Sequence, residues 1–311
     1  MNFSVIIPNL NGAKLLPSCL KSIKNQEIIL IDNASTDQSI AIAQKIHPQI
    51  KIIKNSQNLG FAAAVNQGIL AASNPYVIVC NNDITLHPGY FKFISQAIKS
   101  HPRVATFVGT TLNKTGDQIE STGLNFNYCG QCSHQNHNKK LGNWLLKIGH
   151  SRRVWGAAAA LVIYKKEIIQ KIGLFDPKFF AYEEDVDLAL RLHNLNYKTL
   201  WVPQALANHL GGATSSKMGN LRNRMDAKNW IYIIIKNYSK KQIWQNLPCI
   251  IEQRFRNCSG LLKNTPFLLW LPTLASTYGQ VILNLSNMIH KRYQIKKYKI
   301  KREYNFFGRR A

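Results

Sequence analysis

The sequence predicts an α/β fold, a doubly wound and mainly parallel sheet with helices on both faces, followed by a helical, basic C-terminal extension. Short apolar runs rich in β-branched residues alternate with helical periodicity, which favours strand, helix, strand units. Residues 28–31 and 76–80 are apolar almost throughout, as is typical of strands covered on both faces. Beyond about residue 215 the chain turns basic, aromatic and helical in pattern, which favours a separate C-terminal region.

The expected elements follow in order from these periods. Strands are expected at residues 3–7, 28–31, 51–54 and 76–80, with helices at 13–24, 39–46 and 62–72 between them. A helix at 90–99 and a strand at 104–108 come next, and residues 111–142, rich in Gly, Asn and His, indicate a long loop or a small hairpin insertion. A strand at 154–164, a short helix, a helical run at 188–195 and a strand at 198–202 complete the sheet. We therefore expect one domain over residues 1–215 and a second region over 216–311.

Basic charge is concentrated in the second region. The 311 residues include 40 Lys and Arg against 15 Asp and Glu, a net charge of +25; residues 216–311 hold 19 of the basic residues and 3 of the acids. A cationic region attracts phosphate, either of nucleic acid or of an anionic membrane leaflet. Charge alone does not separate these partners, but at 45% hydrophobic residues the composition excludes a wholly disordered chain.

Residues 264–290 contain no Lys, Arg, Asp or Glu. The stretch is long enough to cross a bilayer, but Pro266 and Pro272 interrupt it and many Asn, Ser and Thr residues make it a poor hydrocarbon segment. We expect an amphipathic, interfacial region rather than a spanning helix. Residues 291–310, with nine basic residues and one acid, suit the headgroups of an anionic membrane surface.

The six cysteines are scattered, which predicts mostly free thiols and a reducing compartment. The N-terminus enters a short apolar run without a basic leader, so no secretory signal is predicted and the expected location is the cytoplasm. One local group stands apart, because its two thiols and two imidazoles could bind Zn²⁺ or could belong to a polar loop. Its members are Cys129, Cys132, His134 and His137.

Polar residues follow three of the expected strands, where parallel sheets bind ligands. Asp32 ends the second strand and could accept a hydrogen bond from a nucleobase imide or a ribose hydroxyl, whereas residues 35–37 suit a helix N-cap. Asp83 follows the fourth strand in the sequence NND; one carboxylate plus substrate phosphates is how Mg²⁺ is commonly held. Gly60 opens a helix of small residues, a pattern that suits tight packing as well as phosphate binding.

An acidic cluster occupies residues 183–187. Like charges beside an aromatic wall favour proton uptake, which suits a general base, and Asp185 is our candidate. Glu183 and Asp187 are expected to be solvent or helix-end charges, Glu183 above all.

Six motifs follow one another along the chain: VIIPNLNG, IDNASTD, NLGFAAAVNQGI, NND, a long run from GAAAALVIYKK to RLHNLNYKT, and NHLGG. In this order, over roughly residues 3–215, they resemble the family 2 glycosyltransferases, closest to the bacterial rhamnosyltransferase-like branch. The resemblance implies a GT-A fold, a nucleotide-diphosphate sugar donor, a divalent metal (Mg²⁺ or Mn²⁺) and inversion at the anomeric carbon.

The resemblance also implies roles for single residues. Asp32 would contact the nucleobase, and Asp83 would hold the metal with His209 nearby. Asn81 stands where the family has the first acid of its Asp-x-Asp motif. Glu184 and Asp185 match the family's acidic pair, with Asp185 as the base. The implied donor-binding residues are Pro8, Asn9, Asn11, Asp32, Gly60, Asn66, Asn81 and Asn82.

The predicted function is transfer of a sugar, rhamnose or another deoxyhexose, to a hydroxyl of a lipid-linked or cell-envelope glycan at the inner face of the cell membrane. The expected partners are this donor, this acceptor and the anionic membrane surface, with no nucleic acid. A nucleotidyltransferase is an alternative, although the sequence PNLNGAK after the first strand lacks a Gly-rich, basic phosphate loop. A nucleic-acid-binding protein would explain the charge but leave Asp32, Asp83 and Asp185 unexplained. A catalytically inactive relative is the remaining alternative, disfavoured because all three acids are present.

Overall fold

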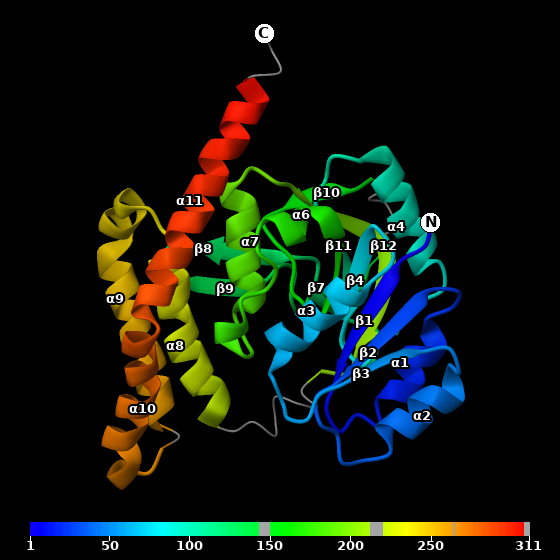
Figure 1. Cartoon of the computed structure of the whole chain (residues 1–311), viewed down its shortest axis with the longest axis horizontal. Helices are drawn as coiled ribbons and strands as arrows, with labels where there is room; N and C mark the ends of the chain where they lie inside the picture. The colour runs from blue at the N-terminus through cyan, green and yellow to red at the C-terminus, as the bar shows by residue number, and fades with distance from the viewer. Residues whose placement is uncertain (143–149, 212–219, 264, 308–311) are drawn as a thin grey trace.

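The computed structural model of the chain describes residues 1–142, 150–211, 220–263 and 265–307. One sheet of ten strands forms its centre, in the order β10-β12-β6-β11-β4-β1-β2-β3, with β5 beside β12 and β7 beside β6 (Figure 1). Its strands are β1 (Ser4–Asn9), β2 (Glu27–Asp32), β3 (Lys51–Lys54), β4 (Tyr76–Cys80), β5 (Ile84–Leu86), β6 (Thr106–Leu112), β7 (Ile119–Ser121), β10 (Arg152–Val154), β11 (Leu161–Lys165) and β12 (Thr199–His209).

Strand directions confirm a mainly parallel sheet. The strands β1, β2, β3, β4, β6 and β12 run one way, and β5, β7, β10 and β11 run the other. In register, Asn9 is level with Asp32, so β1 and β2 end together. The polar residues after these strands therefore lie at one edge of the sheet.

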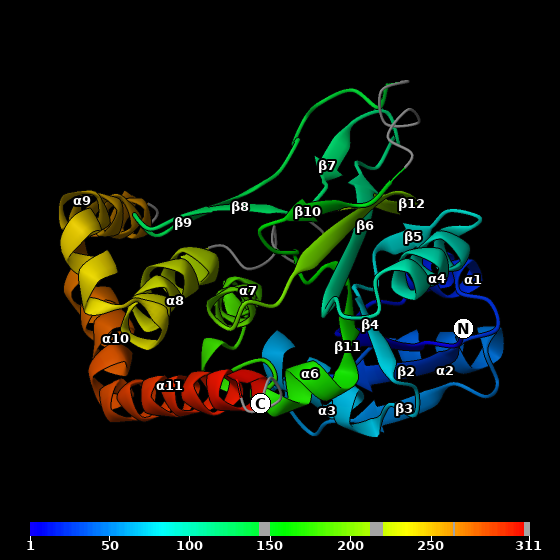
Figure 2. The ribbon, with the colours of Figure 1, turned by 90° about the horizontal axis from the view of Figure 1, so that it is seen from above.

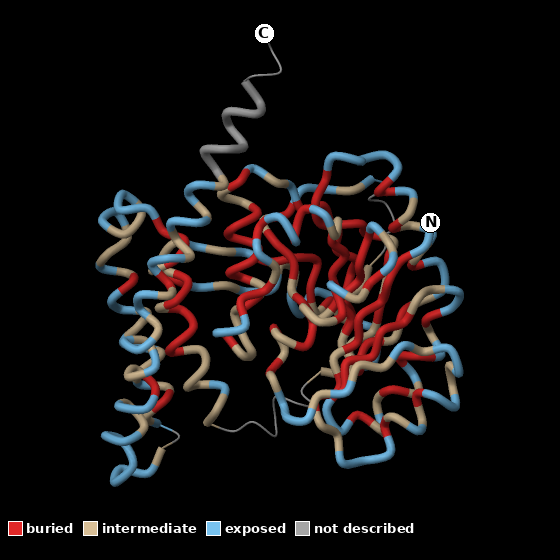
Figure 3. The backbone as a smooth tube through the Cα atoms, viewed as in Figure 1, coloured by how far each residue is buried: buried red, intermediate tan, exposed pale blue. Residues whose placement is uncertain are grey.

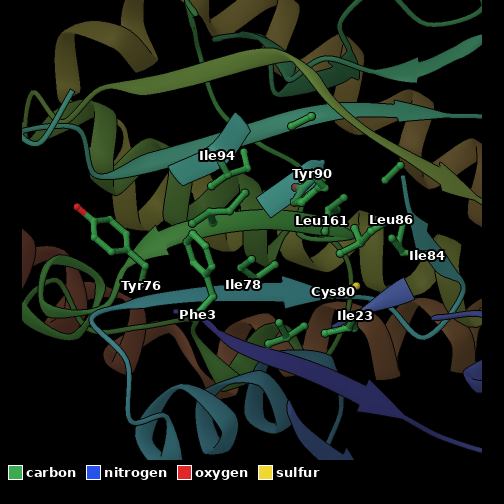
Figure 4. Packing of buried hydrophobic residues seen from close by; sticks show 14 of the residues in the cluster. Phe3, Ile23, Tyr76, Ile78, Cys80, Ile84, Leu86, Tyr90, Ile94 and Leu161 are labelled. Carbon is green, nitrogen blue, oxygen red and sulfur yellow. The ribbon is translucent and has the colours of Figure 1, made fainter. Parts of the chain in front are cut away.

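Helices cover both faces, as predicted. Alternate residues of β1 face opposite sides of the sheet. Val5 and Ile7 pack with α1 (Leu16–Ser22), α2 (Ser39–Ile46) and α4 (Tyr90–Ser100). Figure 4 shows part of the buried hydrophobic cluster on this face. Ile6 packs on the other face with α3 (Phe61–Ala71), α6 (Lys166–Lys171) and α7 (Glu184–Asn194). The period of two in a strand produces this division, and both faces contribute fully buried side chains.

The single strand expected at 154–164 is wrong, because β10 ends at Val154 and β11 begins only at Leu161. The small residues between them leave the sheet. A Cβ on Gly156 would lie 2.8 Å from the Cβ of Ala189, so α7 packs closely against this segment. The amide of Ala159 is then free to donate to Asp185 at 3.0 Å. Sheet pairing is replaced here by contacts that shape a cavity.

The hairpin expected within 111–142 is present as β8 (Leu124–Asn127) and β9 (Gln131–His134). Figure 2 shows it reaching from the sheet to α9 (Lys240–Lys263). At its turn Cys129 forms a disulfide with Cys249, which corrects the expectation of a free thiol there and removes Cys129 from the zinc ligands considered above. Cys19, Cys80, Cys132 and Cys258 are free. Within the described ranges, no group of three or more His, Cys, Asp or Glu side chains is arranged to hold a metal.

The C-terminal region is helical, as predicted, with α8 (Asn220–Asn237), α9, η3 (Phe267–Leu269), α10 (Trp270–Leu283) and α11 (Leu285–Phe307) beside the sheet (Figure 1, Figure 2). A third core joins Phe179 and Leu190 of the first region to Trp230, Ile233 and Met288 of these helices. The boundary expected at residue 215 lies in 212–219, outside the described residues, and the division into two domains stays a prediction.

A buried ionic network reinforces this junction. Lys236 of α8 lies 2.7 Å from Asp176 and 2.9 Å from Asp187, while Arg191 lies 2.9 Å from Asp187 and Lys291 lies 2.6 Å from Asp176. Asp187 lies in the first turn of α7, as a helix-end charge would, but its side chain is fully buried, so the expectation of a solvent charge was wrong for it. Burial raises the pKa of Asp187, but Lys236 and Arg191 outweigh burial and lower it. The last acid of the cluster therefore joins the two regions.

Surface exposure differs along the chain, as Figure 3 shows for α9 and α10, whose backbone is mostly exposed or intermediate. Leu268, Leu271 and Leu283 keep 88%, 80% and 81% of their surface exposed. Within the described segments, no helix combines the length and apolar character that crossing a bilayer requires.

Candidate active site

A cavity of about 480 Å³ opens at the sheet edge where β1, β4 and β12 end, closed on the other side by the hairpin and the start of α7. Nine of the predicted site residues line it: Pro8, Asn9, Gly60, Asn81, Asn82, Asp83, Glu184, Asp185 and His209. Residues separated by up to about 200 positions thus meet in one place, as expected for ligand binding at the carboxyl ends of parallel strands.

Amide side chains build the wall beneath β1 and β4. Asn9 donates to Asp32 at 3.2 Å and accepts from Asn82 at 2.9 Å. A Cβ on Gly12 would lie 2.1 Å from the Asn9 Oδ1, so only glycine leaves room for this pair. The network holds both amides at the cavity surface in a fixed orientation.

Three of the residues predicted to bind the nucleotide-sugar donor do not line this cavity. Asp32 is buried behind Asn9 and accepts from the amide of Ser35 at 3.1 Å. Asn11 accepts from the amide of Thr36 at 2.8 Å. Asn66 makes two hydrogen bonds with the backbone of Phe175, at 2.8 and 3.0 Å, and so supports the packing of α3. Their roles in donor binding stay predictions.

Gly60 combines both interpretations considered from the sequence. Its φ of +83° lies in the region that favours glycine, and an added Cβ would come within 2.6 Å of Phe180. Gly60 also lines the cavity, so the tight packing it permits brings the start of α3 to the site.

Asp83 and His209 face each other across the cavity floor. The His209 Nε2 lies 3.2 Å from the Asp83 Oδ1, and its Nδ1 lies 2.7 Å from the Glu120 Oε2. Burial alone would lower the pKa of His209, but the two carboxylates outweigh it and raise that pKa to about 10. Glu120, on β7, therefore fixes the orientation of the imidazole and favours its charged form.

These residues fit a divalent cation held mainly by its ligand. The Asp83 Oδ1 is buried and faces the imidazole of His209, whose Nε2 lies 3.2 Å away. A carboxylate oxygen and a neutral imidazole nitrogen are suitable ligands for Mg²⁺ or Mn²⁺ when phosphate oxygens complete the shell, and a cation bound here would displace the proton from the Nε2 of His209.

Asp185 stands at the start of α7 with both oxygens oriented by the backbone. Its Oδ2 accepts from the amide of Ala159 at 3.0 Å and its Oδ1 accepts from the amide of Val186 at 2.7 Å. Loss of solvent raises the pKa of Asp185 despite these bonds. Burial, and then the charge of Asp185, raise the pKa of Glu184 well above its usual range. This pair can accept a proton at the edge of the cavity.

The turn before α7 is strained and is held from the C-terminal region. Phe180, Tyr182 and Glu183 have φ values of +65°, +66° and +65°, unusual for residues with side chains. The buried Asn229 of α8 donates from its Nδ2 to the carbonyls of Phe179, Ala181 and Tyr182 at 3.1, 2.9 and 2.8 Å. Helix α8 thus positions the segment that carries the acidic pair.

Sequence reasoning missed three residues of the site: Glu183 and Arg222, which line the cavity, and Glu120, which pairs with His209. Glu120 lies in the irregular insertion, where no period predicts its direction. Glu183 was expected to be a solvent or helix-end charge; it does stand at the N-cap of α7, but it lines the cavity with its Oε2 buried and does not face solvent. Burial and Asp226 raise its pKa well above the usual range. Arg222, from the C-terminal region, also lines the cavity. The excess of Lys and Arg in that region was the only sequence signal that indicated a basic residue near the site.

Comparison with known sequences identifies relatives. The model of the family described as "Glycosyl transferase family 2" matches residues 4–172, more than half of the chain. A "PGL/p-HBAD biosynthesis glycosyltransferase" of Mycobacterium bovis is 33% identical over 115 residues, which cover 34% of this chain and 41% of that protein. An "N-acetylglucosaminyl-diphospho-decaprenol L-rhamnosyltransferase" of Mycobacterium tuberculosis is 25% identical over 201 residues, 58% of this chain and 66% of that protein. The chain thus spans less than half of the mycobacterial protein with the higher identity.

Solved structures share the fold. TarS (residues 1–349) of S. aureus in complex with UDP-GlcNAc superposes with a TM-score of 0.59 at 16% identity, covering 99% of this chain and 92% of that chain. GalNAc-T7 with UDP, GalNAc and Mn²⁺ gives a TM-score of 0.58 at 16% identity, covering 89% and 57%. These likenesses support the GT-A fold, and the family match over residues 4–172, which include β1 and β4 of the cavity, shows that the chain belongs to glycosyl transferase family 2.

Proposed function

We propose that the chain is an inverting glycosyltransferase that moves a sugar from a nucleotide-diphosphate donor to a hydroxyl of a lipid-linked or cell-envelope glycan. The observation that carries the proposal is one cavity with the Asp83 and His209 pair at its floor and the Asp185 carboxylate at its rim. A diphosphate leaving group and an acceptor hydroxyl need these two kinds of residue.

The donor occupies the part of the cavity at the ends of β1 and β4. Asn9, Asn81 and Asn82 offer amides to the ribose and the phosphates. Asn9 also bonds to Asp32, the proposed partner of the nucleobase. The family resemblance and the polar character of this wall support the assignment. The family resemblance supports the assignment of Asn11, after β1, and Asp32, at the end of β2 behind Asn9, to the nucleoside end of the donor.

Asp185 receives the proton of the acceptor hydroxyl. The hydroxyl oxygen forms its bond to the anomeric carbon while the bond from that carbon to the diphosphate oxygen breaks, and that electron pair leaves with the nucleoside diphosphate. Attack opposite the leaving group inverts the configuration. A raised pKa brings Asp185 nearer to the working pH, which strengthens it as a base.

Asp83 and His209 are the residues that would hold Mg²⁺ or Mn²⁺ with the donor diphosphate. The cation would neutralise the charge that develops on the leaving phosphate. The solved neighbour GalNAc-T7, whose title records Mn²⁺, supports a divalent metal. Glu120 orients His209 for this role through the bond to Nδ1.

The name of one relative supports the substrate class. That protein is called a rhamnosyltransferase acting on N-acetylglucosaminyl-diphospho-decaprenol, a lipid-linked saccharide. We extend this class to the chain, with a deoxyhexose as the sugar. The exposed leucines of η3 and α10 and the cations of the C-terminal region support peripheral binding to the anionic inner face of the cell membrane from the cytoplasm.

Thermal unfolding with a panel of nucleoside diphosphates and nucleotide sugars, each with and without Mn²⁺, tests the proposal. Ligands that bind only the native state raise the midpoint. A metal-dependent rise with one nucleotide class supports the donor site. An absence of any rise, together with binding to an oligonucleotide, would favour a nucleic-acid-binding protein instead. Incorporation of nucleoside monophosphate into product would favour a nucleotidyltransferase.

A further inference from the structure

A second cavity of about 860 Å³ lies between the hairpin β8–β9 and the helices α8 and α9. We call it the hairpin chamber. It shares the wall residues Cys132, Tyr182, Glu183 and Arg222 with the donor cavity, so the two volumes adjoin at the strained turn before α7. Asp185 lies two residues beyond Glu183 and faces the donor cavity.

The wall of the hairpin chamber is rich in uncharged hydrogen-bonding groups. Its amide and hydroxyl residues are Asn125, Asn127, Gln131, Ser133, Asn223, Gln253 and Asn257. Amides donate and accept at once, which matches the alternating donors and acceptors of a sugar's hydroxyls. Phe126 and Trp230 supply the apolar part of the wall. The volume lies within the range of about 300–1,000 Å³ that is typical of small-molecule sites.

The chamber has a fixed shape because its two walls are joined. Gln131 of the hairpin donates to Gln253 of α9 at 2.5 Å, a bond that persists in a reducing cytoplasm, and the Cys129–Cys249 disulfide adds a second connection where conditions are oxidising. Arg254 donates to the carbonyl of Gly130 at 2.7 Å while its guanidinium lies 5.2 Å from the ring centre of Trp230. A preformed site binds its ligand with less loss of conformational entropy.

The charges of the chamber disfavour a second nucleotide. Glu183 and Asp226 face each other in the wall, and Arg222 is the one basic residue among the side chains that line it in the described structure. Because the pKa of Glu183 is raised, the two carboxyl groups carry about one negative charge, which Arg222 offsets; the wall therefore offers a diphosphate no excess of positive charge, whereas both carboxyl groups can bond to sugar hydroxyls. The ligand is therefore a neutral saccharide rather than a nucleotide or a lipid chain.

We propose that the hairpin chamber binds the saccharide of the acceptor and presents one of its hydroxyls to Asp185 across the shared wall. The inference rests on the proposed function, which supplies the donor on the other side of that wall. The lipid of such an acceptor would leave the chamber toward the exposed apolar residues of α9 and α10.

Saturation-transfer-difference NMR tests the chamber without knowledge of the natural acceptor. The probes are the methyl glycosides of glucose, galactose, mannose, rhamnose and N-acetylglucosamine, with UDP, GDP and dTDP as donor-site probes, all with Mn²⁺. Gln253→Trp fills the chamber from α9 and Asn125→Trp fills it from β8. Glu252→Trp is the matched control, because Glu252 is exposed on α9 and lies outside the chamber wall.

We expect at least one glycoside to receive saturation from the wild-type chain. Both chamber variants should reduce that signal at least fivefold while the nucleotide signal and the circular dichroism stay unchanged, and Glu252→Trp should keep both signals. Glycoside signals that persist in both chamber variants would overturn the inference, as would a wild-type chain that binds a nucleotide and no glycoside. A chain that binds a glycoside in the chamber and no nucleotide would contradict the proposed function instead.

Discussion

The sheet region and the C-terminal helices differ in how many large apolar side chains they leave exposed. Among the described residues, exposed large hydrophobic side chains in the sheet region are Met1, Leu10 and Leu70, whereas thirteen lie between residues 244 and 293. The first region buries its apolar residues between the sheet and the helices that cover both of its faces. The second keeps a row of them at the surface beside many cations.

The two regions therefore differ in where their apolar side chains are buried. The first is complete as a core and offers a cavity; the second packs one face on the first through Trp230 and Ile233 and leaves another face for a surface outside the protein. Exposed apolar area of this size marks an interaction site. The two regions still depend on each other, because α8 holds both the turn before α7 and the buried acids.

The largest effect should come from Asp185→Asn, which tests whether the chemistry belongs to the sheet region alone. The amide keeps the shape but loses the base, so the rate of nucleoside diphosphate release in the presence of acceptor membranes should fall by about 10²–10⁴. The nucleotide-induced rise in unfolding midpoint should be unchanged. A turnover close to that of the wild type would show that Asp185 is not the base.

The second effect concerns the junction between the regions. Lys236→Met removes the cation that Asp176 and Asp187 share and leaves them with Lys291 and Arg191, so the loss of unfolding free energy should stay below the cost of about 3–5 kcal/mol for breaking a buried pair that has no other partner. Lys171→Met, on an exposed pair with Glu167, is the control and should leave the urea midpoint unchanged. Equal midpoints for the two variants would mean that the regions are joined by apolar packing alone.

The same variant predicts a change in pH dependence. Lys236 and Lys291 lower the pKa of Asp176 against the effect of burial, and Lys236 and Arg191 lower that of Asp187. Groups with lowered pKa stabilise the fold above their unfolded pKa of about 3.9, and this stability is lost as pH falls through the folded value. The wild type should therefore lose stability below about pH 5. Lys236→Met should lose less on the same acidification, because its buried acids then gain by protonation.

Much of the sheet region could be predicted from sequence, because its periods are local. The strands Lys51–Lys54 and Tyr76–Cys80 and the helix Ser39–Ile46 have the predicted bounds, and nine predicted site residues share one cavity. The break at Gly156 escaped prediction because it depends on contact with Ala189, 33 residues away. The fates of Glu120 and Cys129 depend on partners about 90 and 120 positions distant, which no local pattern reveals.

A third effect tests how far the second region positions the first. Asn229→Asp keeps the shape but turns a donor that serves three carbonyls into an acceptor facing them, which should cost about 1–3 kcal/mol of stability. Because the turn carries Glu184 and Asp185, kcat should fall several-fold while the nucleotide dissociation constant stays within a factor of two. Asn246→Asp, on α9 with a side-chain bond to the carbonyl of Gln242 and outside the lining of both cavities, is the control. A stability loss with unchanged kcat would limit Asn229 to a structural role.

The smallest effect returns to the exposed leucines. Leu268 on η3 and Leu70 on α3 expose 88% and 62% of their surface, yet only Leu268 has exposed apolar neighbours in the chain, Phe267, Leu269 and Leu271. Transfer of a leucine side chain into a membrane contributes about 1.5–3 kcal/mol when burial is complete, so Leu268→Glu should weaken sedimentation with phosphatidylglycerol vesicles about tenfold. Leu70→Glu should leave it unchanged, because an isolated exposed leucine has no apolar neighbours to enter the bilayer with it. If both substitutions weakened binding equally, the membrane contact would follow total charge rather than the C-terminal apolar face; if neither did, that face would bind another partner.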